Sequence, residues 1–201
     1  MRIPRIHTPG PLAAGVPAVL GEGATNHVVR VLRLAPGAPL VLFDGRGGQW
    51  RARLDTIGKR TASALPEIHE PHETESPLDV VLAQGVARGE RMDYALQKAV
   101  ELGVRAIRPV LTARSGVQLD AERLDKRLAH WHGVIVAACE QCGRNRIPAL
   151  AAPVRFDDYL SATRGPQAGL RLALDPLAAT GLRALAPPAG PVTLLVGPEG
   201  G

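Results

Sequence analysis

Val192-Thr-Leu-Leu-Val-Gly-Pro-Glu-Gly-Gly201 decides the fold class of this 201-residue chain. Its five apolar or β-branched residues run straight into a glycine-rich loop, which predicts a buried strand that ends at the ligand-binding edge of an α/β sheet. Glycines there let the backbone approach a ligand closely. The spacing fits neither the dinucleotide-binding nor the P-loop pattern, so neither kind of site is indicated. A plain turn is the alternative interpretation.

Upstream of this stretch, short apolar runs alternate with amphipathic segments. The predicted strands are 80–86, 104–111 and 170–174, and the predicted helices are 90–102, with Gly103 as C-cap, 120–142 and 177–185. This alternation predicts an α/β domain over residues 78–201 with a mostly parallel sheet. Asp175-Pro176 follows one of the strands, and we interpret it as the cap of the next helix, although its backbone could line a pocket.

The N-terminal third has a different rhythm. Residues 38–43 and 49–57 read as strands joined by the glycine-rich turn 44–48, and 25–34 reads as a helix capped by Thr25 or Asn26. Several strands and one helix within residues 1–70 predict a small β-barrel. Residues 66–77, rich in glutamate and proline, read as a linker.

Charge separates the two parts. The chain has a net charge of +5, and residues 1–66 hold nine basic and three acidic residues, so they carry +6 and the remainder carries −1. A compositional preference for arginine is the alternative explanation, but it does not account for the scarcity of acids in residues 1–66. A basic module beside a near-neutral body favours a polyanion such as nucleic acid as partner. Arg30 and Arg33 are expected on one face of the predicted helix, where paired guanidiniums suit phosphates.

Several classes of protein are disfavoured. No apolar run approaches the roughly 20 residues that a membrane span needs, and the first residues have no apolar core of a secretory signal. Two cysteines, Cys139 and Cys142, make no disulfide framework, so we expect a cytoplasmic, reducing setting. A zinc site is disfavoured because no second CxxC exists, and a redox role because this CxxC ends a predicted helix rather than beginning one.

The segment after the cysteines carries more information. Arg144, Asn145 and Arg146 stand together at the end of the predicted helix. Two guanidiniums flanking an amide can hold phosphates and a base edge. Two further interpretations stay open: complementing the negative end of the helix dipole, or anchoring an interface.

Eight further segments occur in this order along the chain: MRIPRI, NHVVRVLR, LFDG, ARGE, QKAVELGV, ERLDKRLAHW, AACEQCGRNRIP and LLVGPEGG. Together they resemble one known family, the RsmE ribosomal RNA uridine N3-methyltransferases of the SPOUT superfamily, and the resemblance covers essentially the whole chain. AACEQCGRNRIP and the final GPEGG are the most specific of them.

The resemblance implies an N-terminal PUA-like RNA-binding β-barrel over 1–70, a linker over 71–77 and a SPOUT methyltransferase domain with a trefoil knot over 78–201. It also implies a homodimer that binds S-adenosylmethionine and methylates N3 of one uridine in the 16S RNA of the small ribosomal subunit, with no metal and no membrane. The implied cofactor residues are Leu174, Gly197, Glu199, Gly200 and Gly201. The implied RNA-facing residues are Arg2, Arg5, Arg30, Arg33, Arg88, Asn145 and Arg146. Four residues are expected near the active-site crevice or the dimer interface: Glu140, Gln141, Arg144 and Asn145.

The implied chemistry asks little of side chains. The sulfonium carries an activated methyl group, so the protein chiefly aligns it with the nucleophile. The N3–H of uridine is a weak acid, and either a base or a cation that stabilises the anion is needed. Arg144 is the candidate cation, and no base is identified.

In the family, the chain continues after GPEGG into a last strand, a loop similar to LGPRVLRTET and a terminal helix. We therefore expect residues 1–201 alone to lack a complete cofactor site and to be weakly active or inactive. The alternative function is a catalytically inactive PUA-like RNA-binding protein. A small-molecule methyltransferase is disfavoured by the basic N-terminal part.

Overall fold

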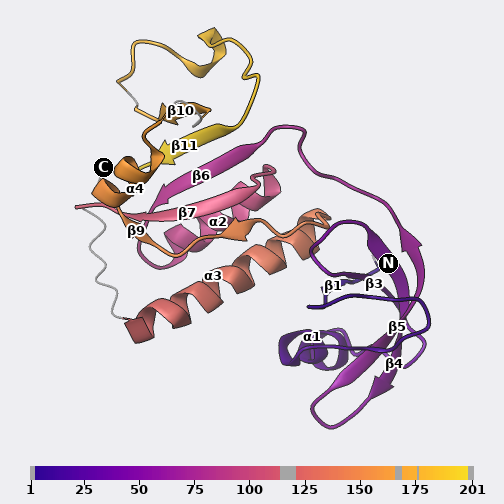
Figure 1. Ribbon diagram of the computed structural model, residues 1–201. Coiled ribbons are helices and arrows are strands. Elements are labelled where there is room, and N and C mark those ends of the chain that lie inside the picture. The colour runs from indigo at the N-terminus through magenta and orange to yellow at the C-terminus, as the bar shows by residue number, and fades with distance from the viewer. Residues whose placement is uncertain (1–2, 114–120, 166–168, 176, 199–201) are drawn as a thin grey trace. The chain divides into compact units, whose positions relative to one another are not determined.

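A computed structural model describes residues 3–113, 121–165, 169–175 and 177–198 of the chain (Figure 1). The predicted residues Arg2, Glu199, Gly200 and Gly201 lie outside this part. The chain divides into two compact units. The first comprises residues up to 75 together with 139–147, and the second comprises 76–138 together with 148–201. Each unit is described by itself.

The first unit is a five-stranded sheet in the order β1-β3-β4-β5-β2. Its elements are β1 (Arg5–His7), β2 (Ala18–Val19), α1 (Glu22–Asn26), the π-helix η1 (His27–Val31), β3 (Pro39–Phe43), β4 (Gln49–Ile57) and β5 (Ala62–Glu70). β1 pairs in parallel with β3, and the other neighbours pair in antiparallel fashion. The predicted hairpin across residues 44–48 is confirmed by the β3–β4 ladder.

Alternation along the strands builds the core of this unit. Leu40 and Leu42 of β3 and Ala52 and Leu54 of β4 are at most 3% exposed, whereas Arg51 and Arg53 between them lie in solvent. Because side chains alternate between the two faces of a strand, every second residue reaches the core. Val28 of η1 lies in the same apolar cluster, so this helix contributes its apolar side to the core of the sheet.

Two predictions about the helix of this unit are corrected. The helix begins at Glu22 with Gly21 as N-cap, not at Thr25 or Asn26. Thr25 is buried, and its hydroxyl donates to the Leu20 carbonyl and accepts from the Ala62 amide. Arg33 lies beyond the helix with φ of 51°, an uncommon left-handed conformation for a residue other than glycine, so it shares no helical face with Arg30.

The linker interpretation of 66–77, which rests on composition, is wrong at its start. β5 continues through Pro66 to Glu70, so the strand ends where the alternative bounds of 71–77 begin. The β4–β5 register shifts between Arg51 and Ala52, which face Ile68 and Pro66. A proline lacks the amide that a ladder requires, and such a bulge is one of the few places where a strand accepts it.

The second unit confirms the predicted parallel α/β architecture. Its sheet has the order β10-β11-β6-β7-β8, with β9 also paired to β7, and the ladders are parallel. The strands are β6 (Val80–Gly85), β7 (Ala106–Leu111), β8 (Ala149–Leu150), β9 (Val154–Arg155), β10 (Leu170–Ala173) and β11 (Val192–Val196). The helices are α2 (Glu90–Glu101), α3 (Ala121–Cys142), whose residues from Cys139 onward belong to the first unit, and α4 (Phe156–Thr163).

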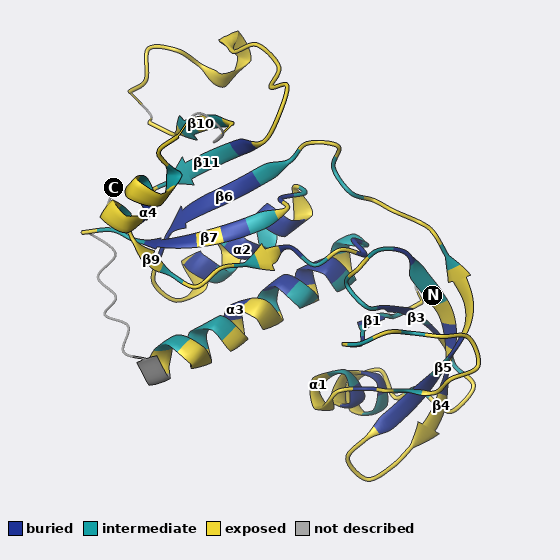
Figure 2. Ribbon diagram, viewed as in Figure 1, coloured by how far each residue is buried: buried dark blue, intermediate teal, exposed yellow. Residues whose placement is uncertain are grey.

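Burial follows the predicted pattern in the central elements. β6 is buried from its second residue onward (Figure 2). α2 buries one stripe formed by Met92, Leu96, Ala99 and Val100, at the spacing of an amphipathic helix. Gly103 follows with φ of 92°, as expected of the glycine that ends a helix.

Two predictions for this unit are wrong. The predicted helix 177–185 is reduced to one 3-10 turn, η2 (Leu182–Ala184), and the described residues of this stretch are exposed. A helix this short is unstable in water unless it buries an apolar face. Asp175 therefore caps no helix, and its carboxylate accepts from the Leu177 amide in a local turn. The sequence also gave no signal for α4, which the structure shows.

One leucine within α2 and one at its C-cap test this packing. Leu96 is fully buried and Leu102, directly after α2, is 82% exposed. We expect Leu96→Ala to lower the free energy of unfolding by about 2–5 kcal/mol because it leaves a cavity. Leu102→Ala should change it by about 0.5 kcal/mol or less. Urea denaturation of both variants measures the difference, and equal effects would contradict the fold of the second unit.

Candidate functional site at the carboxyl edge of the parallel sheet

The neighbouring strands β10 and β11 end beside a cavity of about 390 Å³ in the second unit. Parallel strands deliver their carboxyl ends to one edge, which is where open α/β sheets bind ligands. The cavity is lined by residues that follow or end strands and by the first residue of α4: Thr112, Ala113, Phe156, Ala173, Leu174, Leu195, Val196 and Gly197. Its position agrees with the one predicted from the sequence.

Two of the predicted cofactor residues meet here. Leu174 follows β10 and Gly197 follows β11, and both line the cavity. Sequence reasoning missed Thr112, Ala113 and Phe156. The first two directly follow the predicted strand 104–111, so the rule that identified Leu174 could have identified them. Phe156 begins a helix that the sequence pattern did not reveal.

The walls of the cavity are chiefly apolar. Thr112 supplies the hydroxyl among the described lining residues, and the other side chains are hydrocarbon or absent. Such walls suit a flat or aliphatic part of a ligand, whereas polar recognition falls to backbone groups at the strand ends. Such a lining suits binding and orienting a ligand, and the described lining residues offer no acid–base pair.

The backbone at residues 197 and 198, which follow β11, lies close to the backbone at the end of β6. Gly85 ends β6, and a Cβ placed on it would lie 2.5 Å from Cδ and 2.6 Å from the nitrogen of Pro198. Both distances are well inside van der Waals contact, so only glycine fits without a shift of the loop. Gly85 thus sets the height of residues 197 and 198 above the sheet edge.

The predicted catalytic residue Arg144 lies in the first unit. Its side chain is 5% exposed and its guanidinium binds the carboxylate of Glu75, with Nε 3.0 Å from Oε2 and a second contact from Nη2. The two residues are 69 positions apart in the sequence, so the pair ties the end of α3 to the segment before β6. A buried ion pair of this kind is costly to break, because one charge is left uncompensated.

Asn145 extends this network and is fully buried. Its side-chain amide donates to the His72 carbonyl at 2.6 Å, and its oxygen accepts from Arg5 at 2.7 Å. Arg5 also donates to Gln49 and to the Arg144 carbonyl. The structure therefore brings together three predicted site residues, Arg5, Arg144 and Asn145, as a polar network inside the first unit.

The last turn of α3 contributes two further predicted residues. Glu140 accepts a hydrogen bond from the His7 amide at 2.9 Å. Burial raises the pKa of this carboxyl, and the bond from His7 opposes the rise in part. Gln141 is exposed on the same turn.

The cysteines stand at the end of α3, as predicted. Burial raises the pKa of the Cys139 thiol to about 12, which disfavours the thiolate that metal binding and redox exchange require. Across the described ranges, no three histidine, cysteine or acidic side chains gather as a metal site.

The remaining predicted RNA-facing arginines are exposed. Arg30 lies in the last turn of η1, Arg33 lies two residues beyond its end, and Arg88 lies between β6 and α2. Arg146 lies 3.6 Å from Glu73, at the end of the same polar network. In the part of the chain that the structure describes, no helix is long and apolar enough to cross a membrane.

Fold and site together define a class: a parallel α/β unit with a ligand cavity at its carboxyl edge, joined to a small, basic β-sheet unit. Comparisons with known proteins narrow this class. Residues 74–201 match the family model of the RNA methyltransferase domain, and residues 20–67 match that of the RNA methyltransferase PUA domain.

Individual relatives agree with the family models. A ribosomal RNA small subunit methyltransferase E from Neisseria gonorrhoeae, solved with S-adenosyl methionine, superposes with a TM-score of 0.92 at 38% identity, over 100% of this chain and 81% of that one. A putative methyltransferase from Legionella pneumophila with bound SAM gives 0.92 at 37%, over 100% and 82%. The ribosomal RNA small subunit methyltransferase E of Synechocystis is 32% identical over 88% of this chain, which spans only 57% of that relative.

The chain therefore belongs to the RsmE family of RNA methyltransferases. The predicted fold class is confirmed: an α/β protein with an N-terminal PUA-like domain and a C-terminal SPOUT methyltransferase domain.

Gly85 tests how the glycine loop is held. We expect Gly85→Ala to lower the free energy of unfolding by about 1–3 kcal/mol and to speed amide hydrogen exchange at Val196 and Gly197, because the methyl group displaces Pro198. Gly181→Ala is the matched control, since a Cβ there meets nothing within 4 Å. Unchanged exchange at Val196 and Gly197 in Gly85→Ala would contradict the contact.

A double-mutant cycle tests the Arg144–Glu75 pair. Each single change, Arg144→Met or Glu75→Leu, should cost about 3–5 kcal/mol, because it leaves one charge buried without its partner. The double variant should recover a large part of that loss. Additive losses in chemical denaturation would show that the two side chains are not coupled.

Proposed function

We propose that the protein is an S-adenosylmethionine-dependent methyltransferase that methylates N3 of a specific uridine in 16S ribosomal RNA of the small subunit. The observation that carries the proposal is the cavity at the carboxyl edge, which contains Leu174 and Gly197 within the segment that matches the RNA methyltransferase domain. Two relatives at 37% and 38% identity were solved with the same cofactor.

The residues present fit the cofactor. A volume of about 390 Å³ is within the range of small-molecule sites, and apolar walls at Leu174, Leu195 and Val196 suit the face of an adenine ring. Backbone groups at residues 174 and 197 are available for polar recognition. The cofactor supplies an electrophilic methyl group. The chain's own residues bind it, orient it and shield it from water.

The proposal assigns RNA recognition to the first unit. Exposed Arg30 and Arg33 and the excess of +6 in residues 1–66 supply phosphate contacts, and the PUA match covers residues 20–67. Arg2, Arg5, Arg88 and Arg146 belong to the same proposal. Because Arg5 and Asn145 bind within the polar network, their proposed part is to hold the surface that meets RNA.

Arg144 is the proposed cation that stabilises the uridine anion. Since Glu75 engages its guanidinium in the structure, this role requires the pair to open when RNA binds. A trefoil knot, a homodimer and a cytoplasmic location complete the proposal, supported by the resemblance to the family.

Calorimetric titration of S-adenosylmethionine tests the cofactor site. Leu174→Arg should weaken binding on the order of tenfold or more, because a charged side chain enters an apolar cavity. Leu177→Arg is the matched control, three residues away and 89% exposed, and should bind as the parent does. Both variants are made in the 201-residue chain and in a form that carries the family's C-terminal segment.

Transfer of labelled methyl to 16S RNA completes the test. Incorporation at a uridine N3 that falls with Leu174→Arg supports the proposal. RNA binding without cofactor binding in either form would instead favour the PUA-like RNA-binding protein without catalysis.

A further inference from the structure

The glycine-rich turn between β3 and β4 lies against the segment that follows α3, and both belong to the first unit. Arg46 of the turn and Arg146 are partners in an isolated antiparallel β-bridge, and the Ile147 amide donates to the Gly45 carbonyl at 3.2 Å. Partners in such a bridge project their side chains on the same side, with their Cβ atoms about 5 Å apart. The backbone therefore places two guanidiniums next to each other.

These two guanidiniums keep donors for a ligand. Their side chains are 68% and 58% exposed, and the nearest carboxylates, those of Asp44 and Glu73, lie 3.9 and 3.6 Å away, beyond hydrogen-bond range. Each carboxylate instead accepts from a backbone amide of the turn, Asp44 from Arg46 and Glu73 from Gly48. No described residue accepts a hydrogen bond from the guanidinium of Arg46 or Arg146. Because like charges held opposite each other repel, an anionic ligand between them would stabilise the bridge.

Neighbouring side chains lie directly over the turn because Gly47 and Gly48 have none. A Cβ placed on Gly47 would lie 2.7 Å from Nη2 of Arg146, and one placed on Gly48 would lie 2.5 Å from Nε2 of His69. Both glycines also have positive φ, of 121° and 66°. The guanidinium of Arg146 and the imidazole of His69 thus occupy neighbouring positions along one short piece of backbone.

An aromatic surface adjoins the two arginines. His69 of β5 is the register partner of Trp50 of β4, and the two ring centroids lie 5.0 Å apart at an interplanar angle of 54°. Trp50 is half-buried and packs against the apolar core of the unit, whereas His69 is exposed. The indole therefore supports an imidazole that is itself accessible for stacking.

We propose that this surface, formed by Arg46, Arg146 and His69 with Trp50 behind it, binds one unpaired nucleotide of the RNA substrate. The two guanidiniums hold its phosphate, since a planar guanidinium matches two phosphate oxygens at once. The imidazole stacks on its base, as aromatic side chains do with the splayed bases of single-stranded RNA. The inference rests on the proposed function and adds Arg46, His69 and Trp50 to the residues that contact or support RNA.

Binding of a single-stranded RNA oligonucleotide, compared with a duplex of the same sequence, tests the stacking contact. His69→Ala should lower affinity for the single strand on the order of tenfold, because one base loses its stacking partner. Affinity for the duplex should stay that of the parent, because its bases are already stacked within the helix. His69→Phe keeps a ring and should restore most of the loss. Thermal melting of both variants should match the parent.

The salt dependence of binding tests the phosphate contact. Arg46→Gln should flatten the slope of log affinity against log salt by about 0.7 on the single strand, because one phosphate contact is removed. Arg60→Gln is the matched control. Arg60 is an exposed arginine of the same unit that also lies 3.9 Å from a carboxylate, that of Glu22. Its replacement should leave the slope of the parent.

Four results would overturn the proposal. The first is a single-strand affinity of His69→Ala equal to that of the parent. The second is an equal loss on single strand and duplex that His69→Phe does not restore, because a structural defect produces that pattern. The third is a salt slope for Arg46→Gln no flatter than that for Arg60→Gln. The fourth is an equal loss of affinity for RNA and for heparin in both His69→Ala and Arg46→Gln, since heparin is a polyanion without bases.

Titration of S-adenosylmethionine keeps this test distinct from that of the proposed function. The substituted residues belong to the first unit and the cofactor cavity to the second, so the variants should bind the cofactor as the parent does. If Arg30→Gln weakens RNA binding while His69→Ala and Arg46→Gln do not, the nucleotide site fails and the proposed function stands. If neither the 201-residue chain nor its longer form binds RNA, both fail.

Discussion

The parallel register of β10, β11, β6 and β7 is the constraint on which the second unit depends. Leu172, Leu194 and Leu82 stand in one row across three strands, and the same register carries each strand to a common carboxyl edge. The cavity exists because residues 174 and 197 leave that edge together. The parallel register also explains why position 85 requires glycine, because the chain that leaves β11 crosses directly over the end of its neighbour β6.

A second constraint organises the first unit, and it is electrostatic. Desolvation of two charges can exceed their mutual attraction, so a pair such as Arg144 and Glu75 is weak evidence for stability and better evidence for orientation. Asn145 extends the pair into a network, because its amide donates to the His72 carbonyl and its oxygen accepts from Arg5. The sequence between Cys139 and Ile147 thereby becomes part of a unit whose other residues precede position 76.

The sequence predicted those elements whose signal is local. β6, α2 and β11 have continuous apolar runs or a clear helical stripe, and each lies within two residues of its predicted bounds. The failures depend on distant partners. Pro66 is accepted in β5 because the β4–β5 register shifts beside it. Arg144 is engaged by Glu75, a residue 69 positions away in the sequence. Neither fact is visible in a window of neighbouring residues. The helix predicted over 177–185 failed for the converse reason: its pattern is local, but nothing buries its apolar side.

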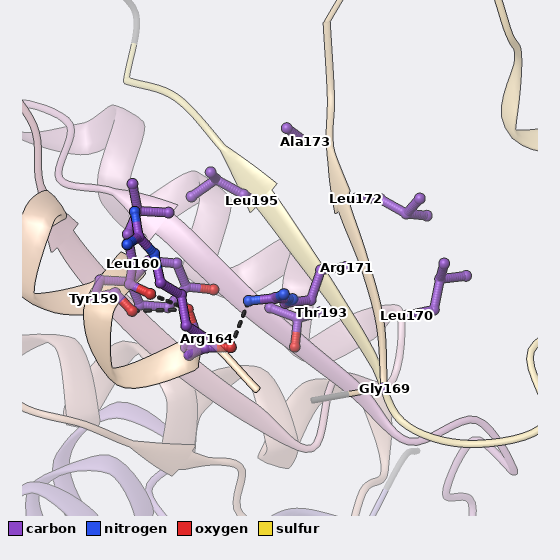
Figure 3. A pocket seen from close by; sticks show the side chains of 11 residues that line it. Tyr159, Leu160, Arg164, Gly169, Leu170, Arg171, Leu172, Ala173, Thr193 and Leu195 are labelled. Atoms are coloured by element: carbon purple, nitrogen blue, oxygen red, sulfur yellow. Dashed lines mark hydrogen bonds between the residues drawn. The ribbon is translucent and has the colours of Figure 1, made fainter. Parts of the chain in front are cut away.

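The short helix α4 is tied to the sheet by both apolar and polar contacts. It has eight residues, about 12 Å of helix. Tyr159 packs on Ala83 and Val110, so apolar side chains of β6 and β7 are buried beneath it. Arg108 stands opposite Ala83 in the β6–β7 ladder and is exposed. At the helix end the Thr163 carbonyl has no further helical partner and accepts a hydrogen bond from Arg171 of β10 (Figure 3). A charged side chain of a neighbouring strand thus satisfies the carbonyl that is left when the helix ends, because so short a helix cannot satisfy it itself.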